Sequence, residues 1–341
     1  MASGLCQIMN TQSPNYAQLY AGLETCIGSF ISDQGDKNSA FRELKPGVLV
    51  ERAGAAIQRT IADFAGADRW LYFRVSADVS AGSRVVTREI APMLRRLKNS
   101  HSIKGWWWLY KIDSRGAAVR LRIFVPPGAS REVEMAIGAQ LADLGRDFRM
   151  LCYEPELRLF GGADGMRAAH EYFCADSEFL AAWPQEDEPL QNPIIPEGLS
   201  VALILRVLRS SGLDLFECWD VFDRICERRR IGHPSDERFA RYQELAKKVI
   251  QAGPQRIFEL YRGEKAHLID EYGAFLDAFG RNISFIYFDG RLECGLREFL
   301  VPIILFHWNR VRLTPFGHFG LPHSVAQELA RLSHKGATER K

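Results

Sequence analysis

The sequence predicts an α+β protein with a ferredoxin-like, split βαβ antiparallel sheet (βαββαβ), an N-terminal helical segment and a mostly helical C-terminal half. Four β-type runs alternate with two helical runs between residues 69 and 153. Residues 1–68 and 198–335 carry apolar residues at helical spacing instead. The polar stretch PQEDEPLQNPIIPEG marks a boundary near 184–198. We therefore expect a helical segment at 1–68, a sheet domain at 69–183, and a helical region at 198–335 that packs on the sheet.

Each element of the sheet has its own signal in the sequence. The expected strands are 70–76 (WLYFRVS), 106–112 (WWWLYKI), 117–125 (AAVRLRIFV) and 148–153, and the expected helices are 84–97 and 132–144. The second and third strands are separated by DSRG, which has hairpin turn chemistry. Because strand side chains alternate, the three consecutive tryptophans must face opposite sides of the sheet in turn. At least one of them is expected to pack under helices.

The rest of the chain is predicted to be helical. The expected helices are 164–183, 199–211, 216–229, 236–251, 254–260, 265–279, 290–308 and 324–333. Asp164 is the expected N-cap of the first, because it follows two glycines and precedes a helical run. The stretch TPFGHFGLPH (314–323) reads as a turn.

Composition excludes several classes of function. The chain has 341 residues, of which 47% are hydrophobic and 25% are charged, as in ordinary globular proteins. With 44 basic and 42 acidic residues the net charge is +2, so no nucleic acid or anionic membrane is expected as a partner. The seven cysteines include no CxxC pair, and no metal site is expected. The N-terminus lacks a signal pattern, and the apolar block Phe299–Phe306 is too short to span a bilayer, so we expect a cytoplasmic protein.

Polar residues gather at the end of the sheet region. The stretch YEPELRLFGGADGM (153–166) places Tyr153 and Glu156 at the expected end of a strand and then passes through two glycines into a helix. On the third strand, Arg120 and Arg122 share one face because they are two residues apart. Two arginines on one sheet face suit an anionic or carbonyl-rich ligand.

Four blocks of the sequence resemble a known family. WWWLYKID, AVRLRIFV, YEPELRLFGGADGMRAAHEYFCADS and ILFHWNR occur in the order and spacing of lantibiotic dehydratase C-terminal domains and stand-alone thiopeptide-type bacteriocin biosynthesis proteins. The resemblance covers roughly residues 70 to 332 and implies one of two activities. An eliminase removes glutamate from glutamylated Ser or Thr of a precursor peptide. A pyridine synthase joins two dehydroalanines in a formal [4+2] cycloaddition and expels water and the leader peptide.

The corner at 153–162 distinguishes the two activities. Eliminases of this family typically read Tyr-x-x-Glu-x-x-Arg-Tyr-Gly-Gly, which matches Tyr153 and Glu156 but places Leu159 at the arginine. Arg158 is one residue out of register, and in a strand that shift turns a side chain to the opposite face. An eliminase must hold a carboxylate, whereas a cycloaddition expels none. The departure therefore favours the synthase, acting without a cofactor on a modified, leader-bearing precursor peptide, with other enzymes of the same pathway as further possible partners.

The resemblance implies roles for seven residues. Tyr153 and His307 are the candidate proton donors and acceptors, and Glu156 would orient one of them. Arg120, Arg122, Arg310 and Asn309 are the candidate substrate-binding residues. The alternative for each is structural: His307 lies in the apolar run FHW, where a core histidine is common, and Asn309 and Arg310 would simply cap the same helix.

One other class of function stays open at this point. A non-catalytic module that binds the precursor is supported by the basic run CERRR (226–230) and the helical N-terminal segment. RNA binding is set aside, because AAVRLRIFV lacks the stacking aromatic residues that RNA-binding sheets of this topology use.

Overall fold

The computed structural model describes residues 69–77, 85–183, 193–229 and 238–338. The predicted helical segment at 1–68 and the linker at 184–192 lie outside the described residues. The chain divides into two compact units, which are treated separately below. Of the described residues, the first unit contains 69–74, 100–104 and 122–153, and the second contains the remainder. The predicted boundary at 184–198 stays a prediction.

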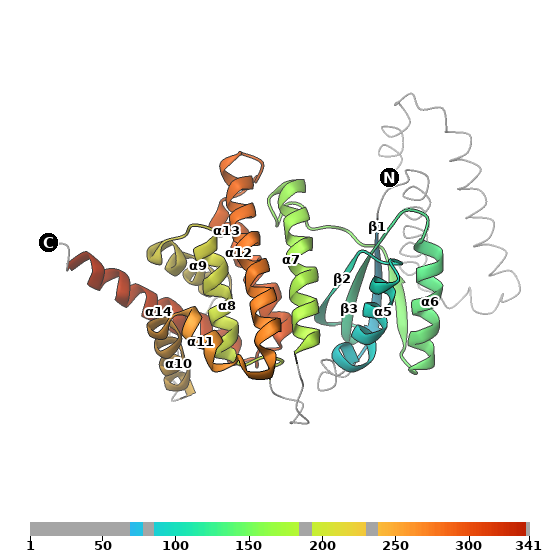
Figure 1. The fold of residues 1–341 in the computed structure, drawn as a ribbon, viewed down its shortest axis with the longest axis horizontal. Helices are drawn as coiled ribbons and strands as arrows, with labels where there is room; N and C mark the ends of the chain where they lie inside the picture. The colour runs from blue at the N-terminus through green and yellow to red at the C-terminus, as the bar shows by residue number, and fades with distance from the viewer. Residues whose placement is uncertain (1–68, 78–84, 184–192, 230–237, 339–341) are drawn as a thin grey trace, which may run out of the picture. The chain divides into compact units, whose positions relative to one another are not determined.

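The elements of the sheet region follow the predicted order. They are β1 (Arg69–Ser76), the π-helical turn η1 (Val85–Ile90), α5 (Ala91–Asn99), β2 (Gly105–Asp113), β3 (Gly116–Val125), α6 (Ser130–Asp143) and β4 (Phe148–Leu151). The strands form one antiparallel sheet in the order β2-β3-β1-β4 (Figure 1). The α+β class and the antiparallel sheet are thus confirmed, and the ferredoxin-like assignment stays a prediction. The last strand is shorter than predicted, because the chain leaves the sheet at Cys152 and forms a turn at 157–161.

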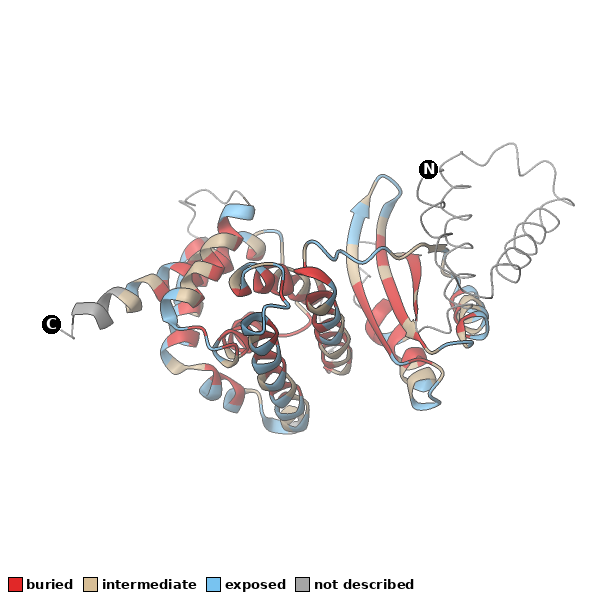
Figure 2. Cartoon of the chain, turned by 90° about the horizontal axis from the view of Figure 1, so that it is seen from above, coloured by how far each residue is buried: buried red, intermediate tan, exposed pale blue. Residues whose placement is uncertain are grey.

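The second unit is built mainly of helices. They are α7 (Gly162–Ala182), α8 (Glu197–Ser210), α9 (Leu215–Arg228), α10 (Arg238–Ala252), α11 (Pro254–Leu260), the 3₁₀ turn η2 (Gly263–Lys265), α12 (Ala266–Phe288), α13 (Leu296–Val311) and α14 (Gly317–Thr338). Helices α7 and α13 both pack on β2. In α8 almost every residue is buried, and the buried residues, red in Figure 2, run along the inner faces of the neighbouring helices.

Three helix boundaries differ from the predictions. The N-cap of α7 is Gly161 rather than Asp164, which lies in the first turn and pairs with Arg167 at 2.9 Å. Helix α12 continues to Phe288 and is followed by Gly290, whose φ of +71° suits the residue after a helix rather than the start of the next one. Helix α14 begins at Gly317, so part of the predicted turn is helical.

The tryptophans of β2 alternate as predicted. The rings of Trp106 and Trp108 stack on one face, with centroids 5.7 Å apart. Trp107 points the other way and packs on Phe173 of α7, with centroids 4.9 Å apart. All three are buried, so β2 is covered on both faces. Only small groups fit beside it: a Cβ added at Gly105 would meet the sulfur of Cys174 at 3.0 Å.

Candidate functional site

A carboxylate is buried where four helices of the second unit meet. Asp176 of α7 is 0% exposed, as are Ser200 of α8 and Arg310 of α13. His307, one turn before Arg310, is 1% exposed, and Tyr272 of α12 is 5% exposed. The other buried residues of these helices are mainly apolar, so each helix places a polar side chain in an apolar interior. A polar group in such a place must be hydrogen-bonded, because burial without a partner is costly.

The hydrogen bonds of this network converge on Asp176. Its Oδ1 lies 2.8 Å from Nδ1 of His307 and accepts the hydroxyl of Tyr272 at 2.7 Å. Its Oδ2 accepts Nε of Arg310 at 2.6 Å. The other ring nitrogen of His307, Nε2, lies 2.9 Å from Oγ of Ser200. These four contacts join α7, α8, α12 and α13.

Two charges hold the carboxyl group ionised. Burial raises the pKa of Asp176, but the nearby charges of His307 and Arg310, with hydrogen bonds from His307 and Tyr272, outweigh burial and bring the pKa well below its ordinary value. Burial and the charge of Asp176 raise the pKa of Tyr272, so this phenol stays protonated. In this network Asp176 is therefore ionised and Tyr272 is protonated.

The chemistry available to His307 follows from these contacts. An ionised carboxylate can only accept hydrogen bonds, so Nδ1 of His307 carries a proton and Nε2 faces the hydroxyl of Ser200. Serine, histidine and aspartate occur here in the order of a catalytic triad. All three are sealed from solvent, however, so Ser200 is not positioned to attack a substrate in this structure. What the network does directly is to fix the imidazole ring between α7 and α8.

Arg310 is held as firmly as His307. Besides its bond to Asp176, its guanidinium lies over the ring of Phe173, 4.9 Å from the centroid. Its Nη1 and Nη2 are buried and have no hydrogen-bond partner among the described residues. The predicted substrate-binding role of Arg310 would use those two nitrogens, because Nε is already engaged.

Asn309 connects α13 to the sheet. Its amide oxygen accepts the backbone N–H of Tyr110 at 2.8 Å, and its amide nitrogen donates to the carbonyl of the same residue at 3.0 Å. The side chain thus pairs with β2 as a neighbouring strand would. Both ends of the amide are engaged, so the predicted role in substrate binding, which stays a prediction, would require this pair to open.

Tyr153 and Arg122 lie together in the first unit. The guanidinium of Arg122, 7% exposed, lies 4.6 Å from the ring centroid of Tyr72 and 5.7 Å from that of Tyr153. The rings of Tyr153 and Trp70 contact edge to face, with centroids 6.0 Å apart. Tyr153 is half-buried, and its ring is held by these two contacts. This phenol beside a guanidinium is a candidate hydrogen-bond donor for a peptide carbonyl.

The remaining predicted residues are more exposed. Glu156 is exposed, and its carbonyl accepts the N–H of Leu159 at 2.9 Å within the turn. Arg120 is half-buried and lies 3.4 Å from Asp113 across the β2–β3 hairpin. Arg158 is exposed in the same turn as Glu156. The strand geometry assumed for the register of Arg158 does not apply, because backbone bonds within 155–162 form a turn.

The two glycines at the corner have a structural explanation. Gly161 and Gly162 have φ of +65° and +91°, a region that other residues rarely adopt. A Cβ added at Gly161 would come within 2.6 Å of the sulfur of Cys294, and one at Gly162 would overlap the carboxyl group of Glu293. The N–H of Glu293 also donates to the carbonyl of Gly161 at 2.9 Å. The glycines therefore let the segment 292–294 lie directly against the start of α7.

The residues that sequence reasoning missed are Asp176, Ser200 and Tyr272. Asp176 lies four residues after Tyr172 and three before Phe179, on the buried stripe of α7. A carboxylate on an apolar helical stripe was the available signal, because such a group needs a partner from another element. Nothing in the sequence around Tyr272 identified the partner helix.

No cluster of three or more His, Cys, Asp or Glu residues within the described ranges is arranged to hold a metal ion. The five cysteines of the described ranges are free, and burial raises the pKa of Cys174 to about 12. None of the described helices is long and apolar enough to cross a bilayer.

Comparison with known proteins identifies the family. The tRNA-dependent lantibiotic dehydratase MibB from Microbispora sp. 107891 is similar in structure, with a TM-score of 0.56 and 16% identity. The match covers 78% of this chain and only 28% of that one. Two further structures are more distant. TsrL has a TM-score of 0.45 and 14% identity, and the match covers 76% of this chain and 94% of TsrL. The pyridine synthase TbtD from thiomuracin biosynthesis has a TM-score of 0.39 and 12% identity, and the match covers 77% of this chain and 98% of TbtD. No curated protein matches. The family described as lantibiotic biosynthesis dehydratase C-term matches residues 70–317, and the chain belongs to it.

Proposed function

We propose that the protein is a thiopeptide pyridine synthase. It acts on a leader-bearing peptide that contains two dehydroalanines. The iminol tautomer of one amide and its dehydroalanine act as a 2-azadiene, and the second dehydroalanine adds across it with two new C–C bonds. Loss of water and then of the leader as a carboxamide gives the aromatic ring and closes a macrocycle. The substrate is converted into the macrocycle, water and the leader carboxamide, so the reaction needs neither an oxidant nor a reductant.

The corner at 153–162 is the observation that supports this reaction over elimination. In the family pattern, elimination uses an arginine where this chain has Leu159, and the neighbouring Arg158 is exposed in a turn. The corner thus offers no buried guanidinium for a departing glutamate, which would need one. A cycloaddition has no such requirement.

The residues have distinct roles in this proposal. Tyr153 donates its hydroxyl proton to the oxygen of the amide that becomes the iminol and takes up the proton that leaves the amide nitrogen, and Arg122 keeps a positive charge beside that phenol. His307 transfers protons in the two eliminations, which requires its buried ring to become accessible to the peptide and Ser200 to move away from Nε2. Glu156, exposed at the corner, orients one of these two proton-transfer groups, and Arg120 binds carbonyls of the peptide. Much of the rate enhancement would come from folding a flexible peptide, which can supply about 7–11 kcal/mol in the best model systems.

Elimination of glutamate is the second candidate, and Arg122 favours it. A guanidinium that is 7% exposed and lies beside a tyrosine could hold a glutamyl carboxylate in place of the missing corner arginine. A non-catalytic module that delivers the precursor to other enzymes of the pathway is the third.

One assay separates the three candidates. The purified protein is given a leader peptide with two dehydroalanines and, separately, a glutamylated peptide, and both are followed by mass spectrometry. Release of an intact leader carboxamide together with a macrocycle supports the synthase. Loss of glutamate alone supports the eliminase. If the protein binds a peptide tightly but changes neither substrate, the result supports the non-catalytic module and contradicts both enzymatic roles.

A further inference from the structure

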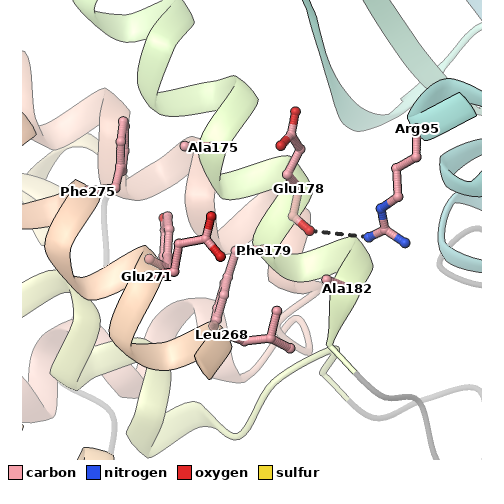
Figure 3. Close-up of a pocket in the computed structure, with 9 residues that line it drawn as sticks. Arg95, Ala175, Glu178, Phe179, Ala182, Leu268, Glu271 and Phe275 are labelled. Carbon is pink, nitrogen blue, oxygen red and sulfur yellow. Dashed lines mark hydrogen bonds between the residues drawn. The ribbon is translucent and has the colours of Figure 1, made fainter. Parts of the chain in front are cut away.

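A cavity of about 280 Å³ lies between α7 and α12 in the second unit (Figure 3). Its walls are Ala175, Glu178, Phe179 and Ala182 from α7, Leu268, Glu271, Tyr272 and Phe275 from α12, and Arg95 from α5. On both helices the spacing is i, i+3, i+4 and i+7, so each helix presents one continuous face to the cavity. None of the roles proposed above uses this cavity.

The floor of the cavity is a stack of aromatic rings. Phe179 and Tyr272 are parallel, with centroids 4.3 Å apart, and Phe275 continues the stack 6.0 Å beyond Tyr272. Ala175 and Ala182 supply the space, because a larger side chain at either position would fill it. The volume falls just below the usual range of small-molecule pockets, roughly 300–1,000 Å³. It suits a single large apolar side chain.

The rim carries charges of both signs: Arg95 and Lys98 are basic, and Glu178 and Glu271 are acidic. Glu178 forms an ion pair with Lys98, and its backbone carbonyl accepts Nη2 of Arg95 at 3.4 Å. Glu271 is exposed on α12 and has no ionic partner among the described residues. A ligand that fills the cavity with an apolar group can therefore add a cation beside Glu271.

The geometry points to a recognition pocket for a peptide, and we propose that it binds an aromatic side chain directly followed by an arginine or lysine. The aromatic ring lies on the Phe179–Tyr272 stack, and the cation pairs with Glu271. This inference concerns peptide recognition and holds whether or not the protein catalyses the cycloaddition. Tyr272 also places the pocket next to the buried network, since its hydroxyl donates to Asp176.

Saturation-transfer NMR on the full chain tests the proposal directly. The probe is acetyl-Gly-Phe-Arg-Gly-amide, and its matched controls replace Phe with Ala or Arg with Glu. The phenylalanine ring protons are expected to receive the most saturation, and each control peptide is expected to bind at least about fivefold more weakly, an effect of about 1 kcal/mol. Absence of binding by the first peptide, or equal binding by the Phe-Glu peptide, overturns the proposal.

Variants locate the binding on the protein. Ala175→Leu and Ala182→Leu fill the cavity from two positions and are expected to weaken binding at least tenfold, whereas Ala274→Leu, at an exposed position of α12 outside the cavity, changes nothing. Glu271→Gln is expected to weaken binding about two- to fivefold, as for an exposed ion pair. Glu259→Gln removes an equally exposed charge on α11 and is the control. Unchanged binding by both cavity-filling variants would place the peptide elsewhere and refute the proposal.

Discussion

At the scale of single residues, Asp176 decides the stability of the helical unit. It is the fully buried counter-charge of Arg310, and it accepts bonds from side chains of two other helices, α12 and α13. Asp176→Asn keeps the shape of the side chain but leaves the guanidinium buried without a negative partner. Breaking a buried pair in this way costs about 3–5 kcal/mol. The free energy of unfolding in urea measures the loss.

An exposed ion pair supplies the control for that variant. Asp270 and Arg262 lie 3.0 Å apart, and both side chains are about half exposed. Asp270→Asn removes the same charge and is expected to cost less than about 1 kcal/mol. Similar losses for the two variants would contradict the buried position of Asp176.

Tyr153 carries the prediction on activity. Tyr153→Phe keeps the ring that contacts Trp70 and Arg122 but removes the proton that the proposed reaction uses. Turnover of the peptide with two dehydroalanines is expected to fall by about 10²- to 10⁴-fold, with stability unchanged within about 0.5 kcal/mol. Tyr72→Phe is the matched control, because Tyr72 contacts the same arginine and has no proposed role in the reaction. Equal turnover by the two variants would exclude Tyr153 as the donor.

At the scale of elements, the glycine corner sets where α7 begins. Gly162→Ala places a Cβ on a residue with φ of +91° and against Glu293. Left-handed backbone costs other residues roughly 1–2 kcal/mol, and displacing Glu293 adds to this, so a loss of about 1–3 kcal/mol in unfolding free energy is expected. Gly263→Ala, where φ is not positive and nothing lies within 4 Å of the added carbon, is expected to be neutral or stabilising by about 0.4–1 kcal/mol. Equal changes in the free energy of unfolding for Gly162→Ala and Gly263→Ala would contradict this prediction, because they would show that the corner accommodates the added Cβ without cost.

The elements that sequence patterns predicted are those with a local signal. The alternation of WWWLYKI and AAVRLRIFV predicts strands whichever way the rest of the chain packs, and the structure confirms β2 and β3. The end of α12 was misplaced at residue 279 because Gly280 follows it, whereas in the structure this glycine lies inside the helix, where an added Cβ would come within 2.6 Å of Ser210. Asp164 was expected to cap α7, but the helix begins earlier, because Gly161 and Gly162 adopt positive φ. The close contact with residues 292–294 requires this backbone conformation, and a local pattern does not reveal that contact.

The candidate site was harder to predict, for a related reason. His307 and Arg310 were identified from the resemblance, but their partners come from α7 and α8, and pairing between distant helices leaves no mark in a single sequence. The same applies to Asn309, whose bonds to Tyr110 join residues 199 positions apart.

At the scale of the whole molecule, the half-buried His318 and the buried Asp176 contribute to the dependence of stability on pH. Burial, with the charge of Arg229, lowers the pKa of His318 to about 4, and its Nδ1 has no hydrogen-bond partner in the part of the chain that the structure describes. The folded protein therefore favours neutral His318. Its contribution is complete above the unfolded pKa of about 6.5 and is lost as the pH falls from there towards 4.

Asp176 acts in a lower and separate range of pH. Its folded pKa lies below its ordinary value, so its contribution is present above the unfolded pKa of about 3.9 and is lost as the pH falls further. Urea unfolding at a series of pH values is expected to show a decline of about 1–3 kcal/mol between pH 6.5 and 4, and a second decline below pH 4. His318→Gln is expected to flatten the decline between pH 6.5 and 4 and to leave the decline below pH 4 unchanged. Asp176→Asn, less stable throughout, is expected to do the reverse, since its amide does not titrate. A first decline that survives in His318→Gln would assign it to another group and show that protonated His318 is tolerated in the fold.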